Sequence, residues 1–254
     1  MKIREIMSKP VVTGRRTATI KETVKRMADK KIGGIVITEK KIPIGIFTRR
    51  DLLSALLSNI DLDKNTVESV MHTPVLPVSE NDEFITAARQ MRSMDMRRFI
   101  VIQEGGPLCG IVTDLDVVKS YTLTSLNHRS SMATISMGGL TATPSTPLRK
   151  IAKMMMEERR SCTVILKNRK PVGIINESLF VDLAAKFKDP LKFKAEDKMI
   201  KKFCGAQDTD SLRESVINMV KNDFRNIILS DDAGNFTGVV SMRELVTYIV
   251  QAQL

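Results

Sequence analysis

Residues 45–51 read Gly-Ile-Phe-Thr-Arg-Arg-Asp, and the same pattern returns at residues 110–116 as Gly-Ile-Val-Thr-Asp-Leu-Asp. A softened copy lies at residues 238–244, Gly-Val-Val-Ser-Met-Arg-Glu. A fourth, at residues 173–179, reads Gly-Ile-Ile-Asn-Glu-Ser-Leu and lacks both the threonine and the acid. The first glycines of the four copies are spaced by 65, 63 and 65 residues. Such spacing indicates four copies of one structural unit.

Other positions of the unit return with a period of 64 residues. The first apolar residue of a predicted helix recurs as Ile20, Phe84, Leu148 and Leu212. A methionine on the inner face of that helix recurs as Met27, Met91, Met155 and Met219. A residue of the following strand recurs as Ile35, Phe99, Thr163 and Ile227. Agreement of several registers over four copies predicts a tandem repeat, with the methionines as core residues.

The first copy predicts the order of elements within the unit. Residues 19–22, Thr-Ile-Lys-Glu, form a capping box that begins an amphipathic helix. The β-branched residues 35–37 and the apolar residues 44–47 are typical of two buried strands, and residues 51–57 of a second helix. Residues 11–12, two valines, add a short strand before the first helix. The unit is therefore expected to be β-α-β-β-α, an α/β (α+β) fold.

Later copies carry their own helix signals. Residues 211–214, Ser-Leu-Arg-Glu, form a second capping box, and Pro147 is expected at the first helical position, where its missing N–H costs nothing. Residues 121–136 interrupt the repeat, are rich in Ser and Thr, and predict a linker centred on Asn127, His128 and Arg129.

The repeats are expected to pair. The predicted boundaries are residues 1–60, 64–122, 130–188 and 195–254. A unit of about 64 residues buries too little surface to be secure alone, so we expect two pairs, residues 1–122 and 130–254.

Composition restricts the location and the class of partner. No apolar run approaches the roughly 18 residues of a membrane-spanning helix, and the N-terminus lacks the apolar segment of a secretory signal, so we expect a cytoplasmic protein that does not engage a membrane. Three cysteines without a CxxC pair and only two histidines, His72 and His128, suit neither a disulfide framework nor a metal site. A net charge of +11 favours anionic partners, namely nucleotide phosphates, nucleic acid or an acidic protein surface. A lysine-biased surface that serves solubility stays an equal alternative.

The glycine–threonine–aspartate motif resembles the signature of CBS domains. The openings Ile6-Met7 and Val70-Met71, each followed by a proline (Pro10 and Pro74), are also similar to this family. The resemblance implies four CBS repeats paired into two Bateman modules, in a disc like that of the gamma subunit of AMP-activated protein kinase. It also implies ligand clefts between paired repeats, with AMP, ADP, ATP or S-adenosylmethionine as the bound molecule.

The resemblance assigns the site residues. It implies that the motif acid binds ribose hydroxyls, that the motif hydroxyl binds phosphate, and that a basic residue at the start of the preceding strand completes the phosphate site. The residues at these positions are Thr48, Asp51, Arg98, Thr113, Asp116, Ser241 and Glu244. A carboxylate only accepts hydrogen bonds and so suits a ribose diol, and a helix N-terminus favours an anion. The position of Arg98 is held by Gly34, Cys162 and Asn226 in the other copies, so the clefts differ in charge.

A purely structural interpretation stays open at each motif. Thr48 and Asp51 also fit a helix cap with an acid in the first turn, as do the equivalent pairs in the second and fourth copies. Because only the first pair of repeats has two complete motifs, we expect it to bind ligand preferentially. We expect a weak or empty site in the third copy, where Leu179 replaces the acid and Asp182 lies a turn away.

The predicted function is regulatory binding of an adenosine-containing ligand rather than catalysis. The sequence has no glycine-rich phosphate loop, no metal-ligand cluster and no evident Cys–His pair, so we expect no catalytic residues and no required cofactor. A regulatory signal would then pass to a separate protein partner. The sequence leaves open whether the protein forms a homodimer. The alternative is a basic protein that associates with nucleic acid, which the low aromatic content (no Trp, two Tyr) disfavours.

Overall fold

The computed structural model describes residues 1–103, 106–124 and 130–252. Repeat 1 contains β1 (Thr13–Gly14), α2 (Ile20–Asp29), β2 (Gly34–Glu39), β3 (Ile42–Thr48) and α3 (Arg49–Leu57). Repeat 2 contains β4 (Pro77–Ser79), α4 (Phe84–Ser93), β5 (Arg98–Ile102), β6 (Leu108–Thr113) and α5 (Asp114–Thr124). Repeat 3 contains β7 (Leu140–Ala142), α6 (Leu148–Glu157), β8 (Cys162–Lys167), β9 (Lys170–Asn176) and α7 (Glu177–Lys186). Repeat 4 contains β10 (Cys204–Gln207), α9 (Leu212–Lys221), β11 (Asn226–Ser230), β12 (Phe236–Ser241) and α10 (Met242–Ala252).

Each repeat forms one three-stranded sheet, so the predicted β-α-β-β-α unit is confirmed. The first two strands of every sheet pair in parallel across a helical crossover, and the last two pair antiparallel. A short helical segment precedes the first strand of each repeat: α1 (Ile3–Ile6), η1 (Val67–Ser69), η2 (Met132–Thr134) and α8 (Ala195–Lys198).

Most helix signals act as the sequence predicts. Glu22 N donates to Thr19 Oγ1 (3.1 Å) and Thr19 N donates to Glu22 Oε2 (2.9 Å), which completes the capping box of α2. At α9, Glu214 N donates to Ser211 Oγ (3.4 Å), which is one half of the predicted box. Pro147 is the N-cap of α6 rather than its first helical residue, because the helix begins at Leu148.

Two local predictions are shifted. The first strand lies at Thr13–Gly14 and not at residues 11–12, although Val12 O still accepts from Val36 N (3.3 Å) just before the ladder begins. The predicted linker begins too early, since residues 121–124 continue α5 and Met132–Thr134 form η2. Its centre at Asn127, His128 and Arg129 lies outside the described residues.

The two repeats of a pair exchange their opening segments. Helix α1, which opens repeat 1, packs on repeat 2, where Ile3 N donates to Asp82 O (2.9 Å) and Ser8 pairs with Ile111. In return His72, which lies in the opening segment of repeat 2, pairs with Ile46 of β3. The motif glycines make room for this exchange, because a Cβ at Gly45 would lie 2.5 Å from the Sδ atom of Met71. The exchange brings His72 beside the first motif.

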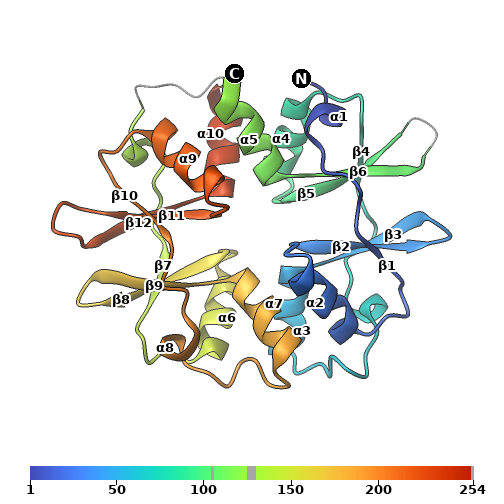
Figure 1. Ribbon diagram of the computed structural model, residues 1–254, viewed down its shortest axis with the longest axis horizontal. Coiled ribbons are helices and arrows are strands. Elements are labelled where there is room, and N and C mark those ends of the chain that lie inside the picture. Colours follow the sequence, from blue (N-terminus) through green and yellow to red (C-terminus); the bar gives the residue numbers. More distant parts are fainter. Residues whose placement is uncertain (104–105, 125–129, 253–254) are drawn as a thin grey trace.

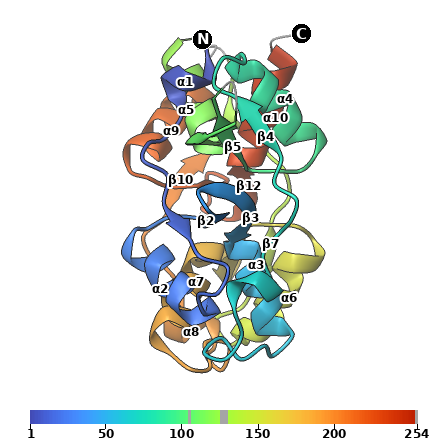
Figure 2. The same ribbon diagram turned by 90° about the vertical axis from the view of Figure 1, so that its right-hand side faces the viewer.

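Sheets pack within a pair, and helices pack between pairs. Val36, Ile46 and Ile100 join the sheets of repeats 1 and 2, and a matching cluster around Val164 and Ile228 joins those of repeats 3 and 4. One helical core unites repeats 1 and 3, and another unites repeats 2 and 4. The four repeats thus surround a common centre, as Figure 1 shows in the view down the shortest axis and Figure 2 in the view turned by 90°. This arrangement confirms the predicted disc of two paired modules.

The recurring methionines are core residues, as predicted. All four, Met27, Met91, Met155 and Met219, are buried on the inner faces of their helices. Within the described part of the chain, no helix combines the length and the apolar character needed to cross a bilayer.

Candidate functional site

The first motif caps a helix and leaves one carboxylate oxygen available. Thr48 is the N-cap of α3, and Asp51 lies in the first turn of that helix. Oδ2 of Asp51 accepts hydrogen bonds from the backbone N and from the Oγ1 atom of Thr48, both at 2.7 Å. Oδ1 accepts no hydrogen bond from any residue that the structure describes. Capping and ligand recognition are therefore compatible at this carboxylate, because each interpretation uses a different oxygen.

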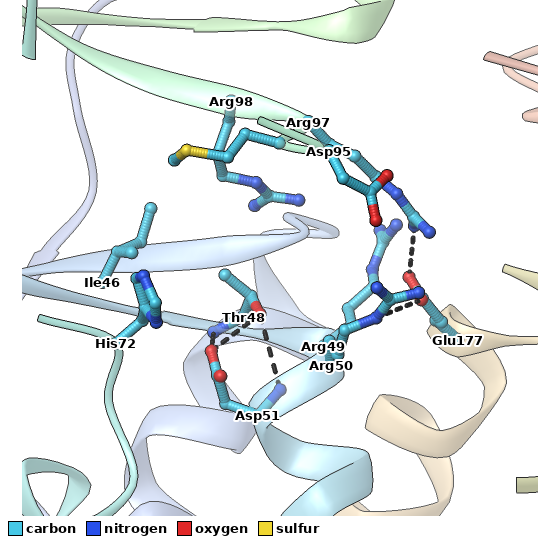
Figure 3. Close-up of a pocket in the computed structure, with 11 residues that line it drawn as sticks. Ile46, Thr48, Arg49, Arg50, Asp51, His72, Asp95, Arg97, Arg98 and Glu177 are labelled. Carbon is cyan, nitrogen blue, oxygen red and sulfur yellow. Dashed lines mark hydrogen bonds and ion pairs between the residues drawn. The ribbon is translucent and has the colours of Figure 1, made fainter. Parts of the chain in front are cut away.

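A cleft of about 190 Å³ opens beside this carboxylate. Its less polar lining residues are Ile46, His72 and Met96. Figure 3 shows Ile46 and His72 on one side of the cleft, with Thr48 and Asp51 below it. Burial raises the pKa of the Asp51 carboxyl, although the hydrogen bonds from Thr48 and the nearby His72 and Arg98 oppose that rise. The cleft therefore combines an apolar wall with a hydrogen-bond acceptor, as small-molecule sites commonly do.

Arg98 reaches from the beginning of β5 into this cleft (Figure 3). Its guanidinium lies against the backbone of repeat 1, where a Cβ at Gly33 would come within 2.7 Å of Nη2 and a Cβ at Gly34 within 2.5 Å of Nη1. Burial, and then the neighbouring Arg49, lower the pKa of Arg98 to about 10, so it is charged at neutral pH. Among the described residues neither Arg98 nor Arg49 forms an ion pair. Two adjacent, unpaired guanidinium groups favour an anion between them.

Arg97, the residue before Arg98, contacts a carboxylate of another repeat. Its Nη1 atom donates to Oε2 of Glu177 (2.8 Å), a residue of repeat 3 that faces it across the centre of the disc. Burial by itself would lower the pKa of Arg97, but the carboxylates of Glu177 and Asp114 outweigh it and raise that pKa. Both arginines therefore point inward.

Replacing Gly33 with alanine is expected to displace Arg98 with little effect on folding. The new Cβ would meet only side-chain ends, those of Arg98 and Arg49, so the backbone can stay in place. We expect AMP affinity to fall roughly 5- to 30-fold, as for the loss of about 1–2 kcal/mol of charge-assisted hydrogen bonding. Calorimetry measures the affinity. Gly138→Ala is the matched control, because a Cβ there meets no atom within 4 Å. Equal affinities in both variants would contradict this placement of Arg98.

The second motif repeats the geometry of the first. Oδ2 of Asp116 accepts from Thr113 N (2.8 Å) and from Thr113 Oγ1 (2.7 Å), and burial raises the pKa of Asp116. Ser8 occupies beside Ile111 the place that His72 occupies beside Ile46. This motif therefore has the same cap and the same available carboxylate oxygen, with a different neighbour.

In the fourth motif, side chains of the protein itself occupy both carboxylate oxygens of the motif acid. Oε2 of Glu244 is hydrogen-bonded to Ser241 N (2.8 Å) and to the Ser241 hydroxyl, and Oε1 accepts from Arg160 Nη1 (3.2 Å). Only about 20 Å³ remains in the cleft beside them. Arg160 stands 64 residues after Met96, so it holds in this cleft the position that Met96 holds in the first one. Ligand binding by Ser241 and Glu244 stays a prediction, and the geometry favours a structural role.

The third motif has space but no acid at the motif position. Asn176 Oδ1 accepts from Leu179 N (3.0 Å) and caps α7. A cavity of about 330 Å³ lies alongside, lined by Ile200, Phe224 and other residues, with Asp182 among them. The expected weakness of this site therefore depends on the missing carboxylate and not on lack of room.

Residues of all four repeats meet in a central cavity of about 100 Å³. Its charged lining consists of Arg49, Arg97, Arg98, Asp114, Glu177, Arg225 and Arg243. Those from repeats 3 and 4 were not identified from the sequence, because no local pattern shows that they face the first motif.

Comparisons with known proteins agree with this architecture. The family model described as CBS domain matches residues 3–58, 67–122, 139–184 and 195–251. The uncharacterized protein MK0525 of Methanopyrus kandleri is 34% identical over 119 residues, which is 46% of this chain and 61% of that protein. The uncharacterized protein MJ1225 of Methanocaldococcus jannaschii is 28% identical over 189 residues, 69% of this chain and 67% of that protein.

Solved structures show the same fold over the whole chain. The crystal structure of MJ1225 from Methanocaldococcus jannaschii superposes with a TM-score of 0.88 at 17% identity and covers 98% of this chain and 100% of that one. A conserved protein from Pyrococcus horikoshii gives a TM-score of 0.68 at 19% identity over 98% of this chain and 100% of that one.

Proposed function

The chain belongs to the CBS-domain family, and from this premise we propose that it is a regulatory protein that binds an adenosine-containing ligand in the cleft of repeat 1. One observation carries the proposal. That cleft is lined both by Asp51, whose Oδ1 atom accepts no hydrogen bond from the described residues, and by Arg49 and Arg98, which form no ion pair with them. The combination suits a molecule with a diol at one end and an anion at the other.

The proposed contacts follow the lining of the cleft. The base lies against Ile46 and Met96, the ribose hydroxyls donate to Asp51 Oδ1, and the phosphate lies against Arg98. Among the four candidates, AMP, ADP and ATP are favoured over S-adenosylmethionine, because the sulfonium of S-adenosylmethionine would bring a positive charge toward two unpaired arginines. Thr113 and Asp116 would hold the ribose of a second molecule with the same carboxylate geometry, but repeat 1 has Gly34 at the position of Arg98 and offers no equivalent phosphate contact there.

The first pair of repeats is the proposed binding half. The cleft of the first motif is open, whereas that of the fourth is nearly filled by the contact between Arg160 and Glu244. Because each helical core is shared by both pairs, ligand binding is best tested in the full chain rather than in separated halves.

We propose that the protein is not an enzyme and that it acts in the cytoplasm by passing the binding signal to a separate protein. The nucleic-acid alternative has less support, because many arginines point into the clefts rather than out to solvent. Arginines that line the clefts and the central cavity include Arg49, Arg50, Arg97, Arg98, Arg160, Arg225 and Arg243. A salt titration of duplex and single-stranded binding distinguishes the two functions.

Replacing Arg98 with alanine tests the proposed function directly. We expect the affinity for AMP to fall roughly 10- to 150-fold, because a charge-assisted phosphate contact is lost, whereas adenosine keeps its affinity within about threefold. Calorimetry of the full chain with AMP and adenosine measures both values. Arg89→Ala, an exposed arginine on α4, is the matched control. If the unmodified chain binds none of AMP, ADP, ATP or S-adenosylmethionine at millimolar concentration, the proposed function is wrong.

A further inference from the structure

Glu177 is a buried carboxylate that enters the repeat-1 cleft from the opposite pair of repeats. It is the first residue of α7 and is 6% exposed. Its Oε2 atom lies 2.8 Å from Nη1 of Arg97, and its Oε1 atom lies 3.9 Å from Nε of Arg50 (Figure 3). No part of the proposed ribose and phosphate contacts uses this residue.

The guanidinium groups around Glu177 have more donors than its carboxylate can satisfy. Nη2 of Arg50 is buried and has no hydrogen-bond partner within the described part of the chain, and burial lowers the pKa of Arg50. Asp95 lines the same cleft but is directed to repeats 3 and 4, where its carboxylate pairs with Arg243 (2.6 Å) and Arg159 (3.4 Å). Glu177 is therefore the carboxylate in ion-pair contact with Arg50 and Arg97, while Asp95 acts on both arginines and Asp114 on Arg97 from further away. A buried donor beside Glu177 still lacks an acceptor among the described residues.

We propose that Glu177 occupies the place of a further phosphate and thereby sets how many phosphates the repeat-1 cleft accepts. The inference rests on the proposed function and names a specificity-determining residue for it. A monophosphate uses the unpaired Arg98 and Arg49 and leaves Glu177 in place. A second or third phosphate enters the space between Arg50 and Arg97 only by displacing the carboxylate, because two anions there repel each other in a partly desolvated site.

The same displacement links ligand charge to the contact between the two pairs of repeats. Glu177 belongs to repeat 3, whereas Arg50 and Arg97 belong to repeats 1 and 2, so these ion pairs cross the interface. Breaking them leaves charges that the incoming phosphates must neutralise. The cleft thus favours AMP over ADP and ATP as long as the interface keeps Glu177 in position.

The test is Glu177→Gln in the full chain, which keeps the shape of the side chain and removes its charge. We expect the affinity for ATP relative to AMP to rise at least about tenfold, as for the loss of one like-charge contact. Calorimetry with AMP, ADP and ATP gives the ratio. Glu157→Gln is the matched control, because it makes the same charge change at an exposed residue paired only with Lys153. A ratio that stays within twofold of the unmodified protein would overturn the inference.

Two further measurements keep the inference testable. Glu177→Asp shortens the side chain by one methylene and withdraws the carboxylate from the cleft. We expect this variant to raise the affinity for ATP relative to AMP by roughly threefold. If the glutamine variant does not fold, an unchanged ratio in Glu177→Asp contradicts the inference. The second measurement uses inorganic tripolyphosphate and inorganic phosphate as probes and records the rise in thermal midpoint that each one causes. If no nucleotide binds the unmodified chain, the proposed function is wrong. If tripolyphosphate stabilises the unmodified protein and Glu177→Gln equally, the proposed role of Glu177 is wrong, whatever the result with nucleotides.

Discussion

Asp51→Ala is expected to weaken AMP binding by roughly 10- to 150-fold, which corresponds to the loss of charge-assisted hydrogen bonds worth about 1.5–3 kcal/mol. The expectation follows because the two carboxylate oxygens differ in their contacts: Oδ2 caps α3, and Oδ1 remains available to a ligand in the cleft. Removal of the cap alone costs only about 0.5–1 kcal/mol of folding free energy. Affinity by calorimetry and the thermal midpoint, measured on the same samples, separate the two effects.

The matched control for the cap is Glu22→Ala. Glu22 makes the same reciprocal bonds with Thr19 at the start of α2, on an exposed surface. We expect it to lose a similar amount of stability and no affinity. If Asp51→Ala behaves in the same way, with a lower midpoint and unchanged affinity, capping is a sufficient explanation of the motif. Asp116→Ala extends the comparison to the second cleft, where the cap has the same geometry.

Phe180→Ala is expected to lower the free energy of unfolding by about 3–5 kcal/mol, the usual cost of removing a fully buried aromatic side chain. Phe180 lies on α7, is 0% exposed, and belongs to the helical core that repeat 3 shares with repeat 1. Because the core is shared, we expect both pairs of repeats to unfold together at a lower denaturant concentration. Equilibrium unfolding in guanidinium chloride, followed by circular dichroism, measures the change.

Ile42→Ala is the control for this measurement. Ile42 is also a large apolar residue, but it is 65% exposed at the beginning of β3, so its removal is expected to change stability by no more than about 0.5 kcal/mol. A loss below about 1 kcal/mol in Phe180→Ala, or a separate early transition confined to repeats 3 and 4, would show that the pairs fold independently and that the shared core matters little.

The shared cores also explain why the charge at the centre of the disc depends on the whole chain. The helices that unite repeat 1 with repeat 3 place the N-terminus of α7 against Arg97, directly before the beginning of β5. Glu177 and Arg97 are 80 positions apart in the sequence, and Arg160 and Glu244 are 84 apart. Each of these ion pairs joins different repeats, so a change in packing between repeats would alter the charge that a ligand meets.

The sequence by itself determined the number of repeats, the order of elements and the residues of the motif. Those features depend on interactions within a few positions: the spacing of Thr48 and Asp51 makes a cap, and the recurring methionines follow the period of a helix. Errors at this level were small shifts, such as the strand placed two residues early at 11–12, since the ends of elements depend on the partner strand.

Only the tertiary structure decided which clefts are open and what charge each contains. The guanidinium of Arg98 fits over Gly33 and Gly34 of another repeat, and Arg160 neutralises Glu244 in a cleft whose motif looks nearly complete in the sequence. A local pattern fixes the direction of a side chain relative to its own helix or strand, but not the side chain that faces it across an interface. That partner is set by how the repeats pack around the centre of the disc, and the charge of a cleft depends on both.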